Sequence, residues 1–344
     1  MFTRDPCLIH ARLRADEVPL LGHPLLDRYV AFVVSRARPN TVRATVSDLR
    51  AFFAVVDKDP AEVKTTDVLG FIAEQRKPRP GRENVVRLGD REGGLSSRTI
   101  QRRLASVSGL FGYLVMVEEL AANPVPRGLS TRRTRGRRGN VALVRSPRTL
   151  PKILDVDEVD ALMTALRKWR DRAMVEAMVL GGLRRCEVLG LRFEDLRPAE
   201  GRVFIAEGKG GHQRLIPISP RFFRTLGRYL EAERPDDAAT KRVFVVLKGP
   251  RRGDGLSEDG LDEVIRAARR RAGLAHGSCH ELRHTCLTRL REAGMALEAV
   301  QAQAGHRSIE STRIYLHLAN DWLSGEYLRA AELIDATRTL GTAR

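Results

Sequence analysis

Residues 279–317 read CHELRHTCLTRLREAGMALEAVQAQAGHRSIESTRIYLH, and the order of histidine, arginine and tyrosine is the informative feature of this stretch. His280 and Arg283 are three positions apart, so one face of a predicted helix presents both side chains. A Gly-His pair follows at 305–306, and Tyr315 lies nine residues after His306. A His-x-x-Arg pair alone occurs by chance in many proteins, so its meaning depends on the residues that accompany it.

Two cationic positions precede this stretch. Residues 182–187 read GLRRCE, in which Arg184 stands three positions before Glu187. Lys209 lies in a GKGG segment between two short apolar runs, 202–206 and 214–218, a pattern that predicts a β-hairpin. These motifs, found together in this order, indicate a catalytic site more strongly than any one of them does alone.

The combination resembles the catalytic set of the tyrosine recombinases, also called the phage integrase family. The resemblance extends to the N-terminal part, where residues 40–52 and 99–114 fall where the core-binding (SAM-like) domain of that family expects them. It implies six catalytic residues: Arg184, Lys209, His280, Arg283, His306 and the nucleophile Tyr315.

The chemistry of these residue types agrees with that resemblance. Cleavage of a DNA phosphodiester increases the negative charge on the phosphorus oxygens, and two guanidiniums can stabilise it without a metal. A tyrosine hydroxyl can attack and conserve the bond energy as a phosphotyrosine ester. An imidazole can take or share the hydroxyl proton, and a lysine can protonate the leaving 5′ hydroxyl. The expected function is a site-specific DNA recombinase or integrase with a 3′-phosphotyrosine intermediate and no cofactor.

Two other functions use the same residues or the same fold. A type IB topoisomerase relaxes supercoils as a monomer with a similar constellation. A catalytically idle DNA-binding regulator would keep the fold and lose the reaction. Recombination of two marked sites, relaxation of any plasmid, and the effect of removing the Tyr315 hydroxyl distinguish the three.

A zinc cluster is an alternative interpretation of the same stretch. Cys279, His280, His284 and Cys286 are metal-ligating residue types close together in sequence. However, Arg283 would stand beside the metal, and no second ligand pair is spaced to close the site. We therefore expect no metal.

Two catalytic assignments have rivals elsewhere in the sequence. Arg185 adjoins Arg184, and the spacing to Glu187 favours Arg184. Tyr327, in the predicted terminal helix, is the only rival nucleophile among the five tyrosines, and Tyr29 and Tyr113 lie on apolar helix stripes and are predicted core residues.

Hydrophobic periodicity predicts a mainly helical chain with a small β-sheet in its C-terminal domain, an α+β fold. Four predicted helices form an N-terminal bundle, with capping signals at 40–41, 66–67 and 96–97. Residues 123–151 contain no acidic residue and are rich in arginine, proline and glycine, which predicts a linker. The expected parts are an N-terminal extension (1–20), a core-binding DNA-binding domain (21–125), a basic linker (126–150), a catalytic domain (151–320), and a C-terminal helix and tail (321–344).

After the linker, the sequence pattern predicts both helices and strands. Asp155 and Glu158 form a predicted capping box, and residues 242–247 are a possible strand. Predicted helices cover 169–180, 222–232, 257–273, 280–294, 296–304, 308–316 and 324–338. We expect the last helix to dock on a neighbouring protomer, with docking on its own domain as the alternative.

Charge and composition constrain the partners. The 344 residues include 60 basic and 43 acidic ones, a net charge of +17, which points to nucleic acid or an anionic membrane. No apolar run approaches the ~18 residues of a spanning helix, and the N-terminus lacks a signal pattern. Four cysteines do not make a disulfide framework in so long a chain. We therefore expect a cytoplasmic, nucleoid-associated protein.

The expected partner is double-stranded DNA with inverted half-sites. A homotetramer on DNA is the expected assembly, with a second recombinase as an alternative partner. The predicted phosphate contacts are arginines of the fourth helix and of the linker: Arg98, Arg102, Arg103, Arg132, Arg133, Arg135, Arg137 and Arg138.

Overall fold

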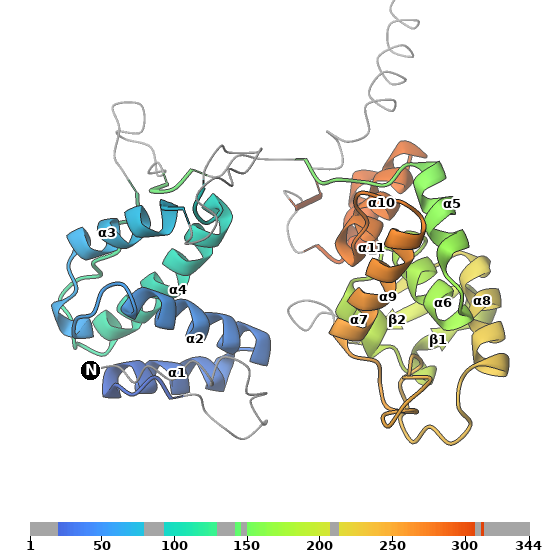
Figure 1. The fold of residues 1–344 in the computed structure, drawn as a ribbon, viewed down its shortest axis with the longest axis horizontal. Coiled ribbons are helices and arrows are strands. Elements are labelled where there is room, and N and C mark those ends of the chain that lie inside the picture. Colours follow the sequence, from blue (N-terminus) through green and yellow to red (C-terminus); the bar gives the residue numbers. More distant parts are fainter. Residues whose placement is uncertain are drawn as a thin grey trace, which may run out of the picture. The chain divides into compact units, whose positions relative to one another are not determined.

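A computed structural model of the chain describes residues 20–78, 93–128, 142–145, 150–206, 213–306 and 311–312. It divides into two compact units, Met1–Arg148 and Thr149–Arg344 (Figure 1). Each unit has a hydrophobic core of its own. The predicted fold class, helical with a small sheet in the C-terminal part, is confirmed. The predicted helix at 324–338 and most of 308–316 lie outside the described residues.

Four α-helices form the described part of the first unit. They are α1 (Pro24–Arg36), α2 (Pro39–Phe53), α3 (Thr65–Arg76) and α4 (Ser97–Met116). Their apolar stripes meet in a core where Leu49, Phe52, Phe71 and Phe111 are fully buried. The predicted helical bundle is therefore correct.

The first residues of these helices show which of the predicted capping signals is present in the structure. Ser96 caps α4 as predicted, since its hydroxyl accepts a hydrogen bond from the Thr99 N–H at 3.2 Å. Helices α2 and α3 begin at Pro39 and Thr65, earlier than the predicted caps at 40–41 and 66–67. In α2 the reason is Pro39, whose fixed φ favours the first helical position.

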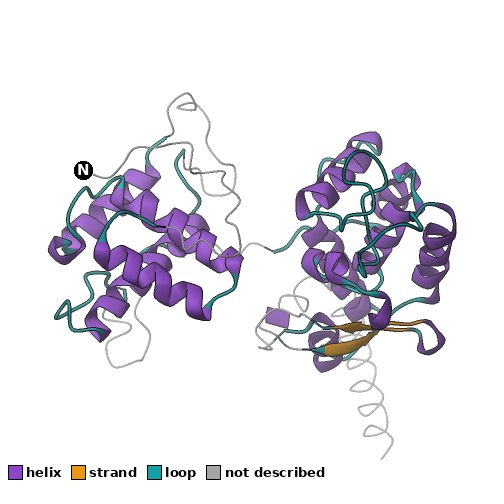
Figure 2. Ribbon diagram, turned by 90° about the horizontal axis from the view of Figure 1, so that it is seen from below, coloured by secondary structure: helices purple, strands orange, loops and turns teal. Residues whose placement is uncertain are grey.

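A three-stranded antiparallel sheet lies along one side of the second unit (Figure 2). Its strands, in the order β1-β2-β3, are β1 (Leu196–Arg197), β2 (Arg202–Ile205) and β3 (Arg214–Pro217). Val203 pairs with Ile216, and both are buried. The predicted hairpin is confirmed, while its turn at 207–212 lies outside the described residues.

The second unit also contains seven α-helices among its described residues. They are α5 (Val156–Ala165), α6 (Trp169–Val179), α7 (Arg185–Gly190), α8 (Pro220–Ala232), α9 (Glu258–Arg271), α10 (Cys279–Glu292) and α11 (Leu297–Ala304), counted over the described residues. Asp155 and Glu158 form the predicted capping box of α5. Helix α6 is buried from Ala173 to Val179 and lies at the centre of the core.

The predicted strand at 242–247 is wrong. The segment forms only isolated bridges, Arg192 to Arg242 and Val245 to Gly255. Val243, Phe244 and Val245 are buried, but loops and a side chain satisfy the backbone: the Val243 carbonyl accepts a hydrogen bond from the Tyr229 hydroxyl at 3.0 Å. A buried apolar run therefore forms here without a ladder.

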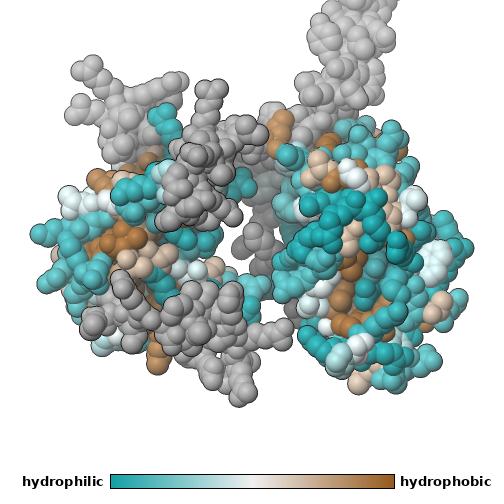
Figure 3. All heavy atoms as spheres, in the orientation of Figure 1, coloured by the Kyte–Doolittle hydropathy of each residue, from teal (hydrophilic) through white to brown (hydrophobic). Residues whose placement is uncertain are grey.

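The face of the described part that Figure 3 shows is largely hydrophilic. In Figure 3, strongly hydrophilic side chains gather over α9, which ends in Arg269, Arg270 and Arg271. No helix in the described ranges is long and apolar enough to cross a membrane.

Candidate active site

The turn that ends α11 brings three predicted catalytic residues together. Arg184 donates a hydrogen bond to the Gly305 carbonyl at 3.1 Å, although the two are 121 positions apart in the chain. Arg283 donates to the Ala304 carbonyl at 2.6 Å and to Nε2 of His306 at 3.3 Å. Arg184, Arg283 and His306 therefore lie in one small region of the second unit.

Arg283 is fixed by two loops. Its side chain is on α10, the residue is 2% exposed, and its guanidinium also donates to the carbonyl of Gly182. Gly182 has φ +66°, and a Cβ there would lie 3.2 Å from Leu287, so glycine suits this close approach. The loop after α6 and the turn after α11 thus fix the orientation of this guanidinium.

His306 is a neutral imidazole of defined tautomer. A guanidinium only donates, so Nε2 of His306 must accept from Arg283, and Nδ1 carries the hydrogen that is donated to Thr312 at 3.0 Å. Burial first, and then the charges of Arg283 and Arg184, lower the pKa of His306 to about 4. His306 is therefore suited to orienting Arg283 rather than to acting as a protonated general acid.

His280 is joined to this group through a residue that we did not select from the sequence. His280 is exposed, one turn of α10 from His284, and their Nε2 atoms lie 2.8 Å apart. Burial, followed by the charges of His280 and Arg283, lowers the pKa of His284 to about 4. His284 is therefore a neutral partner that orients His280.

Glu187 links Arg184 to the rest of the site. Its fully buried carboxylate accepts from the Arg184 guanidinium at 2.7 Å and from the Arg184 N–H at 2.9 Å. Burial, the largest influence, would raise the pKa of Glu187, but hydrogen bonds and charges from Arg214 and Arg184 outweigh it and lower the pKa to about 2. The ionised carboxylate thus binds both Arg184 and Arg214.

Arg214 is a further cation of the site, which the sequence analysis missed. It donates to both carboxylate oxygens of Glu187, at 2.9 and 2.8 Å, and to the Gln303 carbonyl at 3.3 Å. Gly305 has φ +60°, and a Cβ there would lie 2.9 Å from the Arg214 guanidinium. Strand periodicity could have found Arg214, because it shares the inward face of its strand with Ile216 and Ile218.

Arg214 thus connects β3 to the turn that carries His306. Replacing Arg214 with Gln is expected to lower the free energy of unfolding by about 1–3 kcal/mol, because the buried Glu187 loses two charge-assisted hydrogen bonds. Adduct formation on DNA should slow as well, since the hairpin and the turn lose their connection. Thermal unfolding and a single-turnover cleavage assay measure the two effects.

The matched control for Arg214 is Arg202→Gln in the same hairpin. The Arg202 side chain is 53% exposed, and its Glu200 contact is 3.9 Å long, so we expect wild-type stability and rate. Equal effects of the two substitutions would contradict the role of Arg214.

The remaining catalytic predictions, Lys209 and Tyr315, lie outside the described residues. Across the described ranges, no group of three or more His, Cys, Asp or Glu residues could hold a metal ion. Cys279, a member of the alternative zinc set, instead donates through Sγ to Asp262 at 3.4 Å.

The predicted DNA-contacting arginines of α4 differ in their surroundings. Arg98 is exposed at the start of the helix. Arg102 pairs with the buried Asp48 of α2 at 2.5 Å, and its side chain is still 50% exposed. Arg103 is mostly covered and donates to Gln75. The linker arginines Arg132, Arg133, Arg135, Arg137 and Arg138 lie outside the described residues.

The chain is similar to known proteins in sequence and in fold. The sequence model of the Phage integrase family matches residues 152–321, the segment that contains the candidate catalytic residues. The chain is 30% identical over 331 residues to a protein of Mycobacterium tuberculosis named tyrosine recombinase XerD, covering 90% of this chain and 96% of that one.

The fold is also similar to solved structures. One is the XerH site-specific recombinase bound to a palindromic difH substrate in a post-cleavage complex, with a TM-score of 0.64 and 20% identity over 88% of this chain and 84% of that one. Another is a lambda integrase tetramer bound to a Holliday junction, with a TM-score of 0.60 and 19% identity over 90% and 81%.

Proposed function

Since this chain belongs to the phage integrase family of tyrosine recombinases and breaks and rejoins DNA at specific sites, we propose that Arg184 and Arg283 bind its scissile phosphate and that His306 orients Arg283 there. The observation that carries this proposal is their convergence on the turn at 304–306. Two fixed guanidiniums there stabilise the charge that develops on a phosphodiester. The buried and ionised Glu187 keeps Arg184 in place.

The other roles in our proposal follow from the resemblance and from side-chain chemistry. The Tyr315 hydroxyl attacks phosphorus and forms the 3′-phosphotyrosine ester, while the bond to the 5′ oxygen breaks. Lys209 protonates the leaving 5′ oxygen. His280, oriented by the neutral His284, accepts the tyrosine proton. The reverse of these steps, with a 5′ hydroxyl of another strand, rejoins the DNA.

The assembly that we propose is a homotetramer on double-stranded DNA with inverted half-sites. The palindromic substrate of the XerH complex and the tetramer of the lambda integrase complex support it. A second recombinase of the same family remains an alternative partner. Arg98 and Arg102 are the best-exposed of the α4 candidates for phosphate contacts. Each phosphate neutralised should contribute a slope of about −0.9 to the log–log dependence of affinity on salt.

A trapped-adduct experiment tests the proposed mechanism. The wild-type chain is incubated with a nicked suicide substrate, and the covalent adduct is digested and mapped by mass spectrometry. We expect a nucleotide remnant on Tyr315. A remnant on Tyr327 would overturn the assignment of the nucleophile. Relaxation of plasmids without a target site would instead favour a topoisomerase-like activity.

A further inference from the structure

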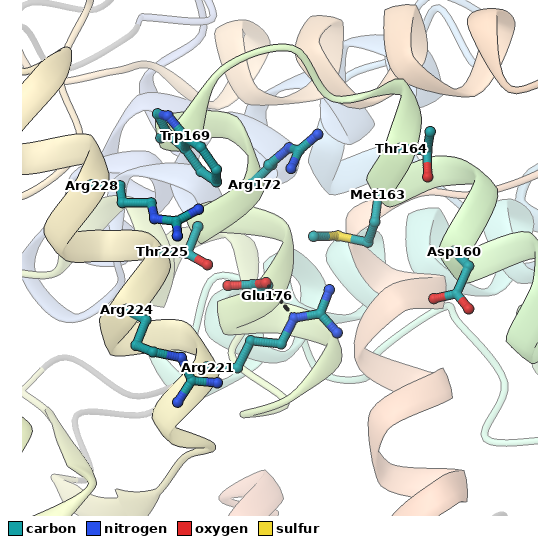
Figure 4. Close-up of a pocket in the computed structure, with 10 residues that line it drawn as sticks. All are labelled: Asp160, Met163, Thr164, Trp169, Arg172, Glu176, Arg221, Arg224, Thr225 and Arg228. Atoms are coloured by element: carbon teal, nitrogen blue, oxygen red, sulfur yellow. Dashed lines mark hydrogen bonds and ion pairs between the residues drawn. The ribbon is translucent and has the colours of Figure 1, made fainter.

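A groove on the second unit carries four arginines away from the catalytic residues. It has a volume of about 630 Å³ and lies between α5, α6 and α8 (Figure 4). None of the four described catalytic candidates lines it. Its lining includes Arg172, Arg221, Arg224, Arg228, Trp169 and Glu176.

The groove is lined by regularly spaced positions of its helices. Arg221, Arg224 and Arg228 of α8 follow an i, i+3, i+7 pattern, so they share one face, spaced about 4.5 and 6 Å along the axis. Residues 169, 172 and 176 of α6 repeat the same pattern. Figure 4 shows the α8 arginines opposite the side chains of α5, with α6 between them. This shape suits a further helix lying between α5 and α8.

The groove has an excess of positive charge. Arg221 donates to Glu176 at 2.8 Å, whereas Arg172 and Arg228 lie over the Trp169 ring, 5.2 and 4.7 Å from its centroid. Within the described ranges, neither of these two nor Arg224 forms an ion pair. One exposed carboxylate, Asp160, stands at the edge. An anionic ligand is therefore expected.

Glu176 distinguishes between kinds of anion. It is 2% exposed, one of its oxygens pairs with Arg221, and the other, Oε2, has no hydrogen-bond partner within the described residues. The backbone of a DNA duplex offers only acceptors and would meet this carboxylate unfavourably. A polypeptide offers carboxylates for the arginines and N–H or hydroxyl donors for Glu176. The lining therefore favours a protein ligand over DNA.

We propose that this groove docks an acidic helical segment of a partner protein. A partner of opposite charge is favoured over a second copy of this chain because the chain has a net charge of +17. Acidic residues at i, i+3 or i+4, and i+7 of the partner helix would face the arginine row of α8.

A binding experiment with the full chain tests the proposal. The probe is a fluorescein-labelled helical peptide of about 15 residues with glutamates at those positions. The variant Arg224→Gln/Arg228→Gln should bind it about tenfold more weakly than the wild type. In a Trp322→Phe background, the peptide should also change the emission of Trp169, then the only tryptophan of the chain. Adduct formation on DNA should stay at the wild-type rate.

The matched control removes the same charge elsewhere in the second unit. Arg251 and Arg252 are about half exposed, and Arg251→Gln/Arg252→Gln should keep wild-type affinity for the peptide. If both double variants bind the peptide equally weakly, the peptide responds only to the overall positive charge of the protein. That result would overturn the proposal. Selective weakening of duplex DNA binding by the groove variant would assign the groove to DNA. Self-association of the wild type that the groove variant loses would assign it to a second copy.

Discussion

Replacing Tyr315 with Phe is expected to abolish the covalent protein–DNA adduct and to leave DNA affinity unchanged. The substitution removes only the attacking oxygen and keeps the aromatic ring. Loss of a nucleophile in other covalent enzymes lowers the rate by on the order of 10⁶, so no adduct should be visible on a suicide-substrate gel. Affinity measured by mobility shift should persist, because phosphate contacts supply most of the binding energy.

The matched control for this experiment is Tyr327→Phe, the same chemical change twelve residues later. This variant should form the adduct at the wild-type rate. The assignment of Tyr315 is contradicted if its Phe variant still becomes linked to DNA. A reversed outcome, in which only Tyr327→Phe is inactive, would make Tyr327 the nucleophile.

Features set by local chemistry could be predicted from the sequence. The Ser96 cap, the capping box of α5 and the hairpin of β2 and β3 depend on residues close together in the chain, and all three are present. The placement of His280 and Arg283 on one helix also follows from their spacing. Their environments do not, because Arg283 is buried and His280 is exposed according to what packs against α10.

Features set by distant residues could not be predicted. Sequence spacing does not predict that Arg184 donates a hydrogen bond to the carbonyl of Gly305, 121 positions away. Nor does it predict that His306 accepts a hydrogen bond from Arg283 and remains neutral. The false strand at 242–247 has the same origin: its apolar pattern records burial, but its hydrogen-bond partners come from other parts of the fold. Composition therefore predicts that a segment is buried without identifying its neighbours.

Exchanging Arg283 for Lys is expected to slow adduct formation by roughly 10²–10³, the effect of losing one preorganised donor to a developing oxyanion. The charge is retained, but an ammonium is a point donor and cannot replace a planar fork. Arg283 bonds two loop carbonyls and His306, so Lys would release the loops at 182 and 304 as well as the phosphate. Single-turnover cleavage at saturating enzyme measures the loss separately from DNA affinity.

The same substitution six residues further along α10 provides the control. Arg289 is partly exposed and has only a long 3.5 Å contact to the Leu154 carbonyl among its described hydrogen bonds, so Arg289→Lys should cleave at the wild-type rate. Thermal unfolding of both variants separates catalysis from folding, because lost carbonyl bonds at 283 would lower the free energy of unfolding by about 1–3 kcal/mol. A folded Arg283→Lys variant that cleaves as fast as Arg289→Lys would remove Arg283 from the phosphate site. A slow but folded variant would support the proposed contact between its guanidinium and the reacting phosphate.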